Sequence, residues 1–140
     1  MKTITICSSM KFYPEVLKIG KRLENMGWSV EYPESSLIMK KRNNFNPTTY
    51  KKTVTAKDKG KFIMNHFAKE LNSNAILVVN KTKNGIRGYI GGNVLMEIGI
   101  AFQARIKIYL LHSYPKSHQF FDELSAINPT VLHGKINKLK

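Results

Sequence analysis

Ile86-Arg87-Gly88-Tyr89-Ile90-Gly91-Gly92-Asn93-Val94-Leu95-Met96-Glu97-Ile98-Gly99-Ile100-Ala101-Phe102 is the stretch that decides the fold of this chain. It combines a glycine-rich loop with a helix that is apolar on every face apart from Glu97, so we expect the helix to be largely buried. Gly91 and Gly92 permit positive φ and a close approach to a ligand, and Asn93 is a favourable N-cap. The helix is therefore predicted to begin at Asn93.

Glu97 is the one charged residue of this predicted helix and lies about one turn from its start. The positive end of the helix dipole favours an ionised carboxylate there, whereas burial opposes ionisation. An ionised, poorly solvated carboxylate suits a nucleophile or a general base. The alternative is a structural ion pair with Arg87 or Arg105 that only fixes the helix.

The whole chain, residues 1–140, is expected to form a single domain with a basic excursion at about 34–60. No Pro/Gly/Ser-rich linker divides these residues, and the length suffices for one core. The single cysteine, Cys7, lies in an apolar strand pattern and is interpreted as a small buried filler. No apolar run has the length of a signal peptide or a membrane span, so a cytoplasmic location and no membrane partner are predicted.

The chain is strongly basic, with 23 Lys and Arg residues against 9 Asp and Glu residues and a formal net charge of +14. This excess permits binding to nucleic acid or other polyanions but does not favour it over a merely solvated basic surface. The basic clusters are Lys40-Lys41-Arg42, Lys51-Lys52 and a tail with Lys135, Lys138 and Lys140.

Strand-like runs alternate with helical patterns along the chain. Strands are predicted at 3–7, 28–32, 75–79, 107–111 and 131–132, and helices at about 14–26, 61–71, 93–102 and 117–126. The run at 75–79 is continuously apolar, as in a central parallel strand. The fold class is therefore predicted as α/β, a single doubly wound, flavodoxin- or Rossmann-like domain with a mostly parallel five-stranded sheet.

Residues from about 34 to 60 show weak periodicity and many Asn, Thr and Lys residues. We interpret this segment as a basic, mobile excursion from the fold. It is either a lid or polyanion-binding arm, or a solvated loop with no specific role.

In doubly wound sheets, ligands bind at the carboxyl ends of the strands near the switch in strand order. Polar and glycine residues that follow the predicted strands should therefore converge there with Glu97. No Gly-x-Gly-x-x-Gly pattern follows the first strand, no Walker A sequence occurs, and no zinc-type Cys/His spacing is present. We therefore predict neither a cofactor nor a metal. The predicted binding residues are Ser8, Ser9, Asn80, Gly91, Gly92 and Asn93, with Tyr89 beside them.

His66 falls on the apolar face of the predicted helix at 61–71, together with Phe62, Ile63, Phe67 and Leu71. A histidine in that position is most simply a hydrogen-bonded structural residue. Histidine also transfers protons near neutral pH, so His66 is a candidate catalytic residue as well.

Several of these motifs together resemble a known family. They are the run 74–80, the stretch Tyr89 to Ala101 with Tyr-Ile-Gly-Gly-Asn and Glu-Ile-Gly, and the run 107–111. This arrangement is similar to the nucleoside 2-deoxyribosyltransferase superfamily, which includes the 2′-deoxynucleoside 5′-phosphate N-hydrolases, and is closest to a branch of small, little-characterised bacterial proteins. The order of elements matches over most of the chain, whereas the specific motif covers only Tyr89 to Ala101.

The resemblance implies an activity and a nucleophile. The family's helix glutamate, which Glu97 matches, attacks C1′ of the sugar and holds a covalent glycosyl-enzyme until a base or water arrives. It also implies that Asn93 and the glycine amides hold a sugar hydroxyl or a 5′-phosphate, and that the protein is a homo-oligomer.

The chain departs from the family at three points. Asn74 stands where the family has an aspartate, and residues 81–92 contain no carboxylate to match its second aspartate. The acid that protonates the base would then be His66, Tyr89 or a carboxylate of Asp122-Glu123. The family's aromatic residue in the first strand is also missing, and Phe12 and Tyr13 are the nearest candidates.

Three hypotheses for function follow. The first is cleavage or transfer of the N-glycosidic bond of a (deoxy)nucleoside or nucleotide, with Glu97 as nucleophile. The alternative is a non-catalytic nucleotide-binding module or sensor on the same fold, since fold does not fix function. The third is a polyanion-binding protein whose affinity falls steeply with added salt.

Overall fold

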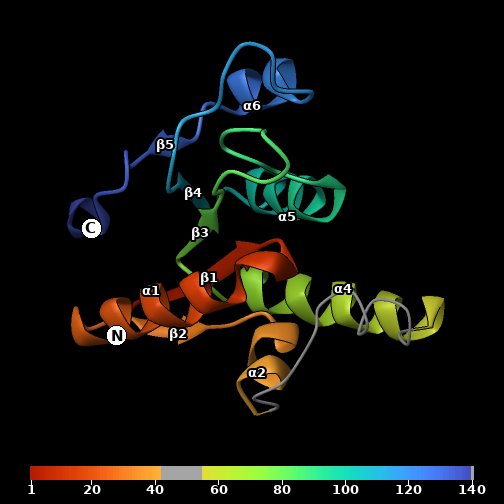
Figure 1. The fold of residues 1–140 in the computed structure, drawn as a ribbon. Coiled ribbons are helices and arrows are strands. Elements are labelled where there is room, and N and C mark those ends of the chain that lie inside the picture. Colours follow the sequence, from red (N-terminus) through yellow and green to blue (C-terminus); the bar gives the residue numbers. More distant parts are fainter. Residues whose placement is uncertain (42–54, 140) are drawn as a thin grey trace.

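A five-stranded parallel sheet forms the centre of the protein in a computed structural model that describes residues 1–41 and 55–139 (Figure 1). Its strand order is β2-β1-β3-β4-β5, and each neighbouring pair is parallel. This is the flavodoxin-like order, so the predicted doubly wound α/β fold is confirmed. The strands are β1 (Thr3–Ser8), β2 (Ser29–Glu31), β3 (Ala75–Val79), β4 (Lys107–Leu110) and β5 (Thr130–Val131).

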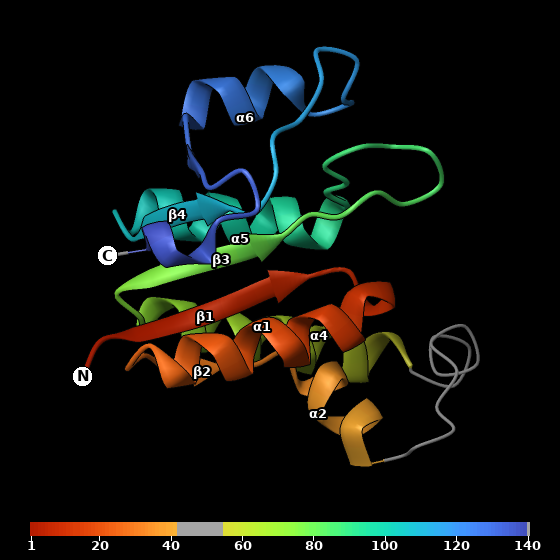
Figure 2. The same cartoon turned by 60° about the vertical axis from the view of Figure 1, so that its left-hand side comes forward.

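Helices cover both faces of this sheet (Figure 2). One face packs against α1 (Tyr13–Asn25) and the short C-terminal helix η2 (Ile136–Lys138), and the other packs against α5 (Gly92–Gln103) and α6 (Phe121–Ile127). Helix α4 (Ala56–Leu71) lies beside α5 and contacts β1, while α2 (Glu34–Lys41) packs on α1. All five residues of β3 are buried, because helices cover both of its faces.

The structure describes two parts of the segment predicted as an excursion, 34–41 and 55–60, and both are largely helical. Helix α2 occupies Glu34–Lys41, and α4 begins at Ala56 instead of near residue 61. The hydroxyl of Thr55 caps α4 by accepting a hydrogen bond from the Asp58 amide at 3.1 Å, a start signal that the weak apolar periodicity hid. The part of the excursion from 42 to 54, with Arg42 and Lys51-Lys52, lies outside the described residues.

Helix α5 is less buried than its sequence predicts. Val94, Ile98 and Ala101 are buried, but Met96 is 45% exposed and Phe102 is 55% exposed. The helix also begins at Gly92 with Gly91 as its N-cap, so the prediction that Asn93 caps it is wrong. The amide of Leu95 donates to the Gly91 carbonyl at 3.0 Å, which places Asn93 inside the first turn.

Helix α4 buries polar side chains in place of an apolar stripe. His66 and Glu70 are its buried residues, whereas Leu71 is 56% exposed. The two residues are four apart and therefore lie on one face, which is turned toward β1 and α5. Such burial needs partners. Among the described residues, no helix is both long and apolar enough to cross a membrane.

Candidate active site

A cavity of about 550 Å³ opens beside the carboxyl end of β1. Its walls come from the segment after β1, from α2, from α4, from the glycine loop and from the first turns of α5. This is the position that the strand order predicts for a ligand. The lining residues are Ser8, Ser9, Met10, Pro33, Glu34, Ser35, Lys59, Phe62, Ile63, His66, Lys69, Lys83, Tyr89, Gly91, Gly92, Asn93, Val94 and Glu97.

The structure brings together eight of the nine residues that the sequence selects. Ser8, Ser9, His66, Tyr89, Gly91, Gly92, Asn93 and Glu97 all line the cavity. Asn80 is the exception. It is buried, and its side-chain amide donates to the His112 carbonyl at 2.7 Å and accepts from the His112 amide at 2.9 Å. Asn80 thus joins the segments that follow β3 and β4, and does not face the cavity.

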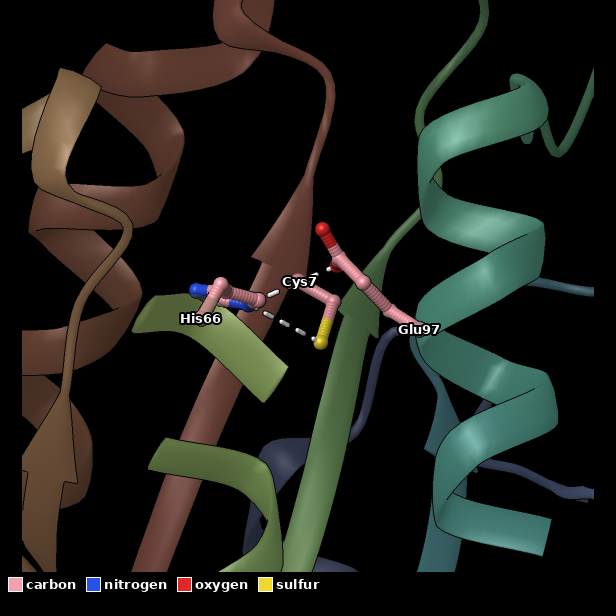
Figure 3. A group of neighbouring side chains, drawn as sticks. All are labelled: Cys7, His66 and Glu97. Atoms are coloured by element: carbon pink, nitrogen blue, oxygen red, sulfur yellow. Dashed lines mark hydrogen bonds and ion pairs between the residues drawn. The ribbon is translucent and has the colours of Figure 1, made fainter. Parts of the chain in front are cut away.

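Three titratable side chains from three different elements meet at the inner end of the cavity (Figure 3). His66 Nε2 lies 3.4 Å from Glu97 Oε2 and 3.5 Å from Cys7 Sγ. His66 comes from α4, Glu97 from α5 and Cys7 from β1. The contact between His66 and Glu97 has ion-pair distance, but Glu97 Oε2 is buried and has no partner in hydrogen-bond geometry.

Glu70 is a fourth member of this cluster that sequence reasoning missed. It is fully buried, and the Cys7 thiol donates to its Oε1 at 3.7 Å. Burial, together with the negative charge of Glu97, raises the pKa of Glu70 to about 9. Glu70 is therefore protonated at neutral pH. Its spacing of four residues from His66 was the available signal, because both must lie on the same helix face.

Cys7 is buried as predicted, but it is more than a filler. Its thiol lies between the His66 imidazole and the Glu70 carboxyl group, and both are at hydrogen-bond distance for sulfur. Burial, followed by the nearby charge of Glu97, holds the pKa of the Cys7 thiol well above its ordinary value. The thiol thus stays protonated and inert as a nucleophile at neutral pH.

The structure does not pair Glu97 with either of the two arginines named for a structural ion pair, and its contact at ion-pair distance is with His66. In the described part of the chain, neither Arg87 nor Arg105 lies at ion-pair distance from it. Its side chain keeps 15% exposure while Oε2 is buried. Oε1 is therefore the oxygen that remains to meet a ligand in the cavity.

The glycine loop folds back on the sheet through a tight turn. Lys83 and Ile86 exchange backbone hydrogen bonds of 3.1 and 2.9 Å around Asn84 and Gly85, which both have positive φ. Gly88 also has positive φ, and a Cβ there would lie 2.3 Å from the Ser113 carbonyl oxygen. Gly91 and Gly92 have ordinary φ, so the expectation that they supply the positive φ is wrong.

Lys83 connects this loop to the segment after β1. Its ammonium group donates to Ser9 Oγ at 3.1 Å and lies 4.8 Å from the centre of the Tyr89 ring. Lys83 thereby holds Ser9 and Tyr89, two of the predicted site residues, in place at the cavity wall. Lys59 and Lys69 also line the cavity, which gives it three cationic side chains.

Two further expectations concern aromatic and acidic residues. Phe12 is in the core and Tyr13 begins α1, and the lining aromatics are instead Phe62 and Tyr89. Asp122 and Glu123 are exposed on α6 and do not line the cavity, so they are not available as acids there. The carboxylates of the cavity lining are Glu34 and Glu97.

Comparisons with known proteins find structural similarity without sequence similarity. No protein-family model matches the chain, and no curated protein matches its sequence. Among solved structures, the Clostridium botulinum CMP N-glycosidase BcmB is similar with a TM-score of 0.53, 15% identity, and coverage of 93% of this chain and 84% of that one. A conserved protein from Enterococcus faecalis V583 is similar with a TM-score of 0.51, 17% identity, and coverage of 93% and 78%. At these identities the similarity shows the fold.

Proposed function

We propose that the protein cleaves the N-glycosidic bond of a nucleotide or (deoxy)nucleoside, with Glu97 as the nucleophile. The observation that carries this proposal is the position of Glu97, a partly exposed carboxylate at the inner end of a cavity of about 550 Å³. That volume suits a ligand of nucleotide size. The fold shared with a CMP N-glycosidase and the resemblance to the nucleoside 2-deoxyribosyltransferase superfamily both support this chemistry.

The reaction proceeds in two displacements. Glu97 Oε1 forms a bond to C1′ while the C1′–N bond breaks, and the electron pair leaves with the base, which takes up a proton. Water then attacks C1′ from the vacated side and releases the sugar, which restores the carboxylate and returns a proton. A free base in place of water would make the protein a transferase. Each step passes through an oxocarbenium-like state that the fixed carboxylate stabilises.

His66 and Tyr89 support this chemistry from two sides of the cavity. His66 lies 3.4 Å from Glu97 Oε2 and directs the other oxygen toward the substrate. The Tyr89 phenol lies near the backbone of Gly91, about 3 Å from where a Cβ would stand. The Tyr89 phenol is therefore our candidate for the group that hydrogen-bonds the sugar or protonates the base.

The remaining lining residues suit the rest of a nucleotide. The amides of the first turn of α5, at Gly92 and Asn93, have no partners within the helix and favour an anionic group. Lys83, Lys59 and the Ser8 and Ser9 hydroxyls lie around the same cavity and complement a 5′-phosphate. The Phe62 ring offers a surface on which a base can stack.

The direct test is chromatographic. The protein is incubated with ribo- and 2′-deoxynucleosides and their 5′-monophosphates, CMP included, with and without a second free base. We expect free base to be released by the native protein and by Glu34→Gln, a matched change in the same cavity. We expect Glu97→Gln to be at least about a thousandfold slower. Equal rates for Glu97→Gln and native protein would overturn the assignment of the nucleophile.

A second candidate is a nucleotide-binding module without catalysis. It is favoured by one observation: among the described residues, the carboxylates that line the cavity are Glu34 and Glu97, and no aspartate does. Saturable binding of a nucleotide by calorimetry, with no base released from any substrate above, would establish this candidate in place of the enzyme.

We also propose that the protein is a homo-oligomer. Exposed apolar side chains lie on two neighbouring helices, with Met64 and Leu71 on α4 and Met96 and Phe102 on α5. A second copy of the chain would cover this surface. Sedimentation velocity should show an oligomer that Phe102→Lys dissociates, and a native monomer at micromolar concentration would remove the proposal.

A further inference from the structure

The cluster of Cys7, His66, Glu70 and Glu97 contains more polar atoms than its hydrogen bonds satisfy. Glu70 Oε2 and Glu97 Oε2 are both buried without a hydrogen-bond partner. Glu70 is fully buried and its other carboxyl oxygen lies 3.7 Å from Cys7 Sγ. Buried carboxyl oxygens are rarely left unpaired, because removing them from water without a partner is unfavourable. Two of them in one cluster indicate that something else belongs there.

Three side chains of the cluster lie close enough together to share one transition-metal ion. One ligand atom each from Cys7, His66 and Glu97 lies within 4.8 Å of the others. The distances from His66 Nε2 are 3.5 Å to the Cys7 sulfur and 3.4 Å to Glu97 Oε2. In tetrahedral zinc coordination, bonds of about 2.0–2.3 Å separate neighbouring ligand atoms by roughly 3.3–3.6 Å. The two distances from His66 fall in that range, and the distance between the ligand atoms of Cys7 and Glu97 is within 4.8 Å.

We propose that Cys7, His66 and Glu97 bind a zinc ion. A thiolate, an imidazole and a carboxylate are together a donor set that zinc accepts in proteins. Binding replaces the thiol proton of Cys7 by a sulfur–zinc bond and releases that proton to solvent. The ion enters through the cavity, since His66 and Glu97 both line it.

This metal site goes beyond the proposed function, and an ion bound there would block the proposed reaction. A Glu97 carboxylate that coordinates zinc is not free to attack C1′. Zinc would therefore act as an inhibitor that competes for the nucleophile, and the active form would be metal-free. The metal site itself can be tested without any substrate, so it stands or falls independently of the enzyme assignment.

Cobalt titration of the full-length, reduced, chelator-treated protein tests the site. Co²⁺ bound to a thiolate gives a near-ultraviolet charge-transfer band, and Cys7 is the only cysteine in the chain. We expect one Co²⁺ per chain with that band and its displacement by one equivalent of Zn²⁺. Cys7→Ser should abolish the band, and Glu97→Gln should keep it while weakening affinity at least about tenfold. His133→Gln, a change at an exposed histidine, should alter neither.

Each of the other outcomes overturns the site. The proposal fails if the protein takes up neither Co²⁺ nor Zn²⁺ saturably. It also fails if Co²⁺ binds without the sulfur charge-transfer band, or if Glu97→Gln binds the metal with native affinity. If Cys7→Ser fails to fold by circular dichroism, Glu97→Gln and His66→Gln decide the question, because both leave the buried thiol in place. If base release is established, one equivalent of Zn²⁺ should also suppress it, and a chelator should restore it.

Discussion

His66 Nε2 lies 3.4 Å from Glu97 Oε2, so helix α4 supplies an imidazole to the carboxylate that helix α5 carries. The two residues are 31 positions apart in the chain, and β3 with the glycine loop separates them in sequence. The pairing depends on the side-by-side packing of α4 and α5. It fixes which oxygen of Glu97 faces the cavity.

Replacing His66 should therefore slow the reaction without removing substrate binding. We expect His66→Gln to lower kcat about 10- to 100-fold with little change in KM, because the imidazole orients the nucleophile and does not hold the substrate. Steady-state kinetics on the best substrate measure the changes in kcat and KM separately. A rise in KM at native kcat would place His66 in substrate binding instead.

Glu70 should make the protein less stable as the pH rises. Its pKa is about 9 in the folded protein against an ordinary 4.5, so between these values the folded state holds a proton that the unfolded state has lost. Stability contributed by this group is full below about pH 4.5 and decreases up to about pH 9.

Glu70→Gln removes that titration while keeping a side chain of similar shape. We expect the variant and the native protein to have similar free energies of unfolding at pH 5, and the variant to be more stable by a few kcal/mol, roughly, at pH 9. Urea denaturation in the presence of a chelator measures the difference at each pH. A difference that stays constant from pH 5 to pH 9 would contradict the raised pKa.

Replacement of two glycines of the central stretch by alanine should affect stability differently. Gly88→Ala places a Cβ 2.3 Å from the Ser113 carbonyl oxygen at a positive φ, and should destabilise the protein by about 1–3 kcal/mol. Gly92→Ala meets no atom within 4 Å and should leave thermal stability unchanged. Any loss of nucleotide affinity in Gly92→Ala would then reflect crowding of the ligand. Equal destabilisation by both changes would refute this account of the loop.

Lys83 should distinguish nucleotides from nucleosides. We expect Lys83→Met to lower kcat/KM for a 5′-monophosphate about 10-fold or more and to change that for the nucleoside little, because a charge-assisted contact is lost only with the phosphate. Lys116→Met, a change at an exposed lysine outside the cavity, is the control. An equal loss on both substrates would mean that Lys83 acts only by holding Ser9 and Tyr89.

Asn80 should matter for stability alone. Asn80→Ala leaves the partly buried amide and carbonyl of His112 without their side-chain partners, at a cost of about 1–3 kcal/mol. Chemical denaturation should show this loss, with kcat and KM of the folded protein unchanged. A selective rise in KM would restore the sequence-based role of Asn80 in substrate binding.

Most of the fold follows from periodicity in the sequence. The continuous run at 75–79 predicts a central strand because helices on both faces leave no polar position, and its five residues are all buried. The start of α4 was placed too late because residues 56–60 are exposed and include no large apolar side chain, so apolar spacing does not reveal them. Helix α5 was expected to be largely buried, but the sheet and α4 leave Met96 and Phe102 exposed.

The candidate site was predictable where side chains follow strands or begin a helix. Ser8, Ser9, Gly91, Gly92 and Asn93 were found by that rule, because parallel strands end at one edge of a sheet. The same rule misplaced Asn80, because it cannot show which way a side chain turns. Cys7, Glu70 and Lys83 were missed as site residues, since their partners lie 59 to 74 positions away in the chain.

Cys7 belongs to β1, which is hydrogen-bonded to β2 on one side and to β3 on the other. The sulfur that His66 contacts is therefore held by the sheet, whereas α2 and the loop that carries Lys83 contribute other parts of the cavity wall. Redesign can exploit this division. Exchanging those parts of the wall should retune which ligand is accepted while the reactive groups keep their spacing, whereas changes beside Cys7 would disturb the architecture of the whole domain.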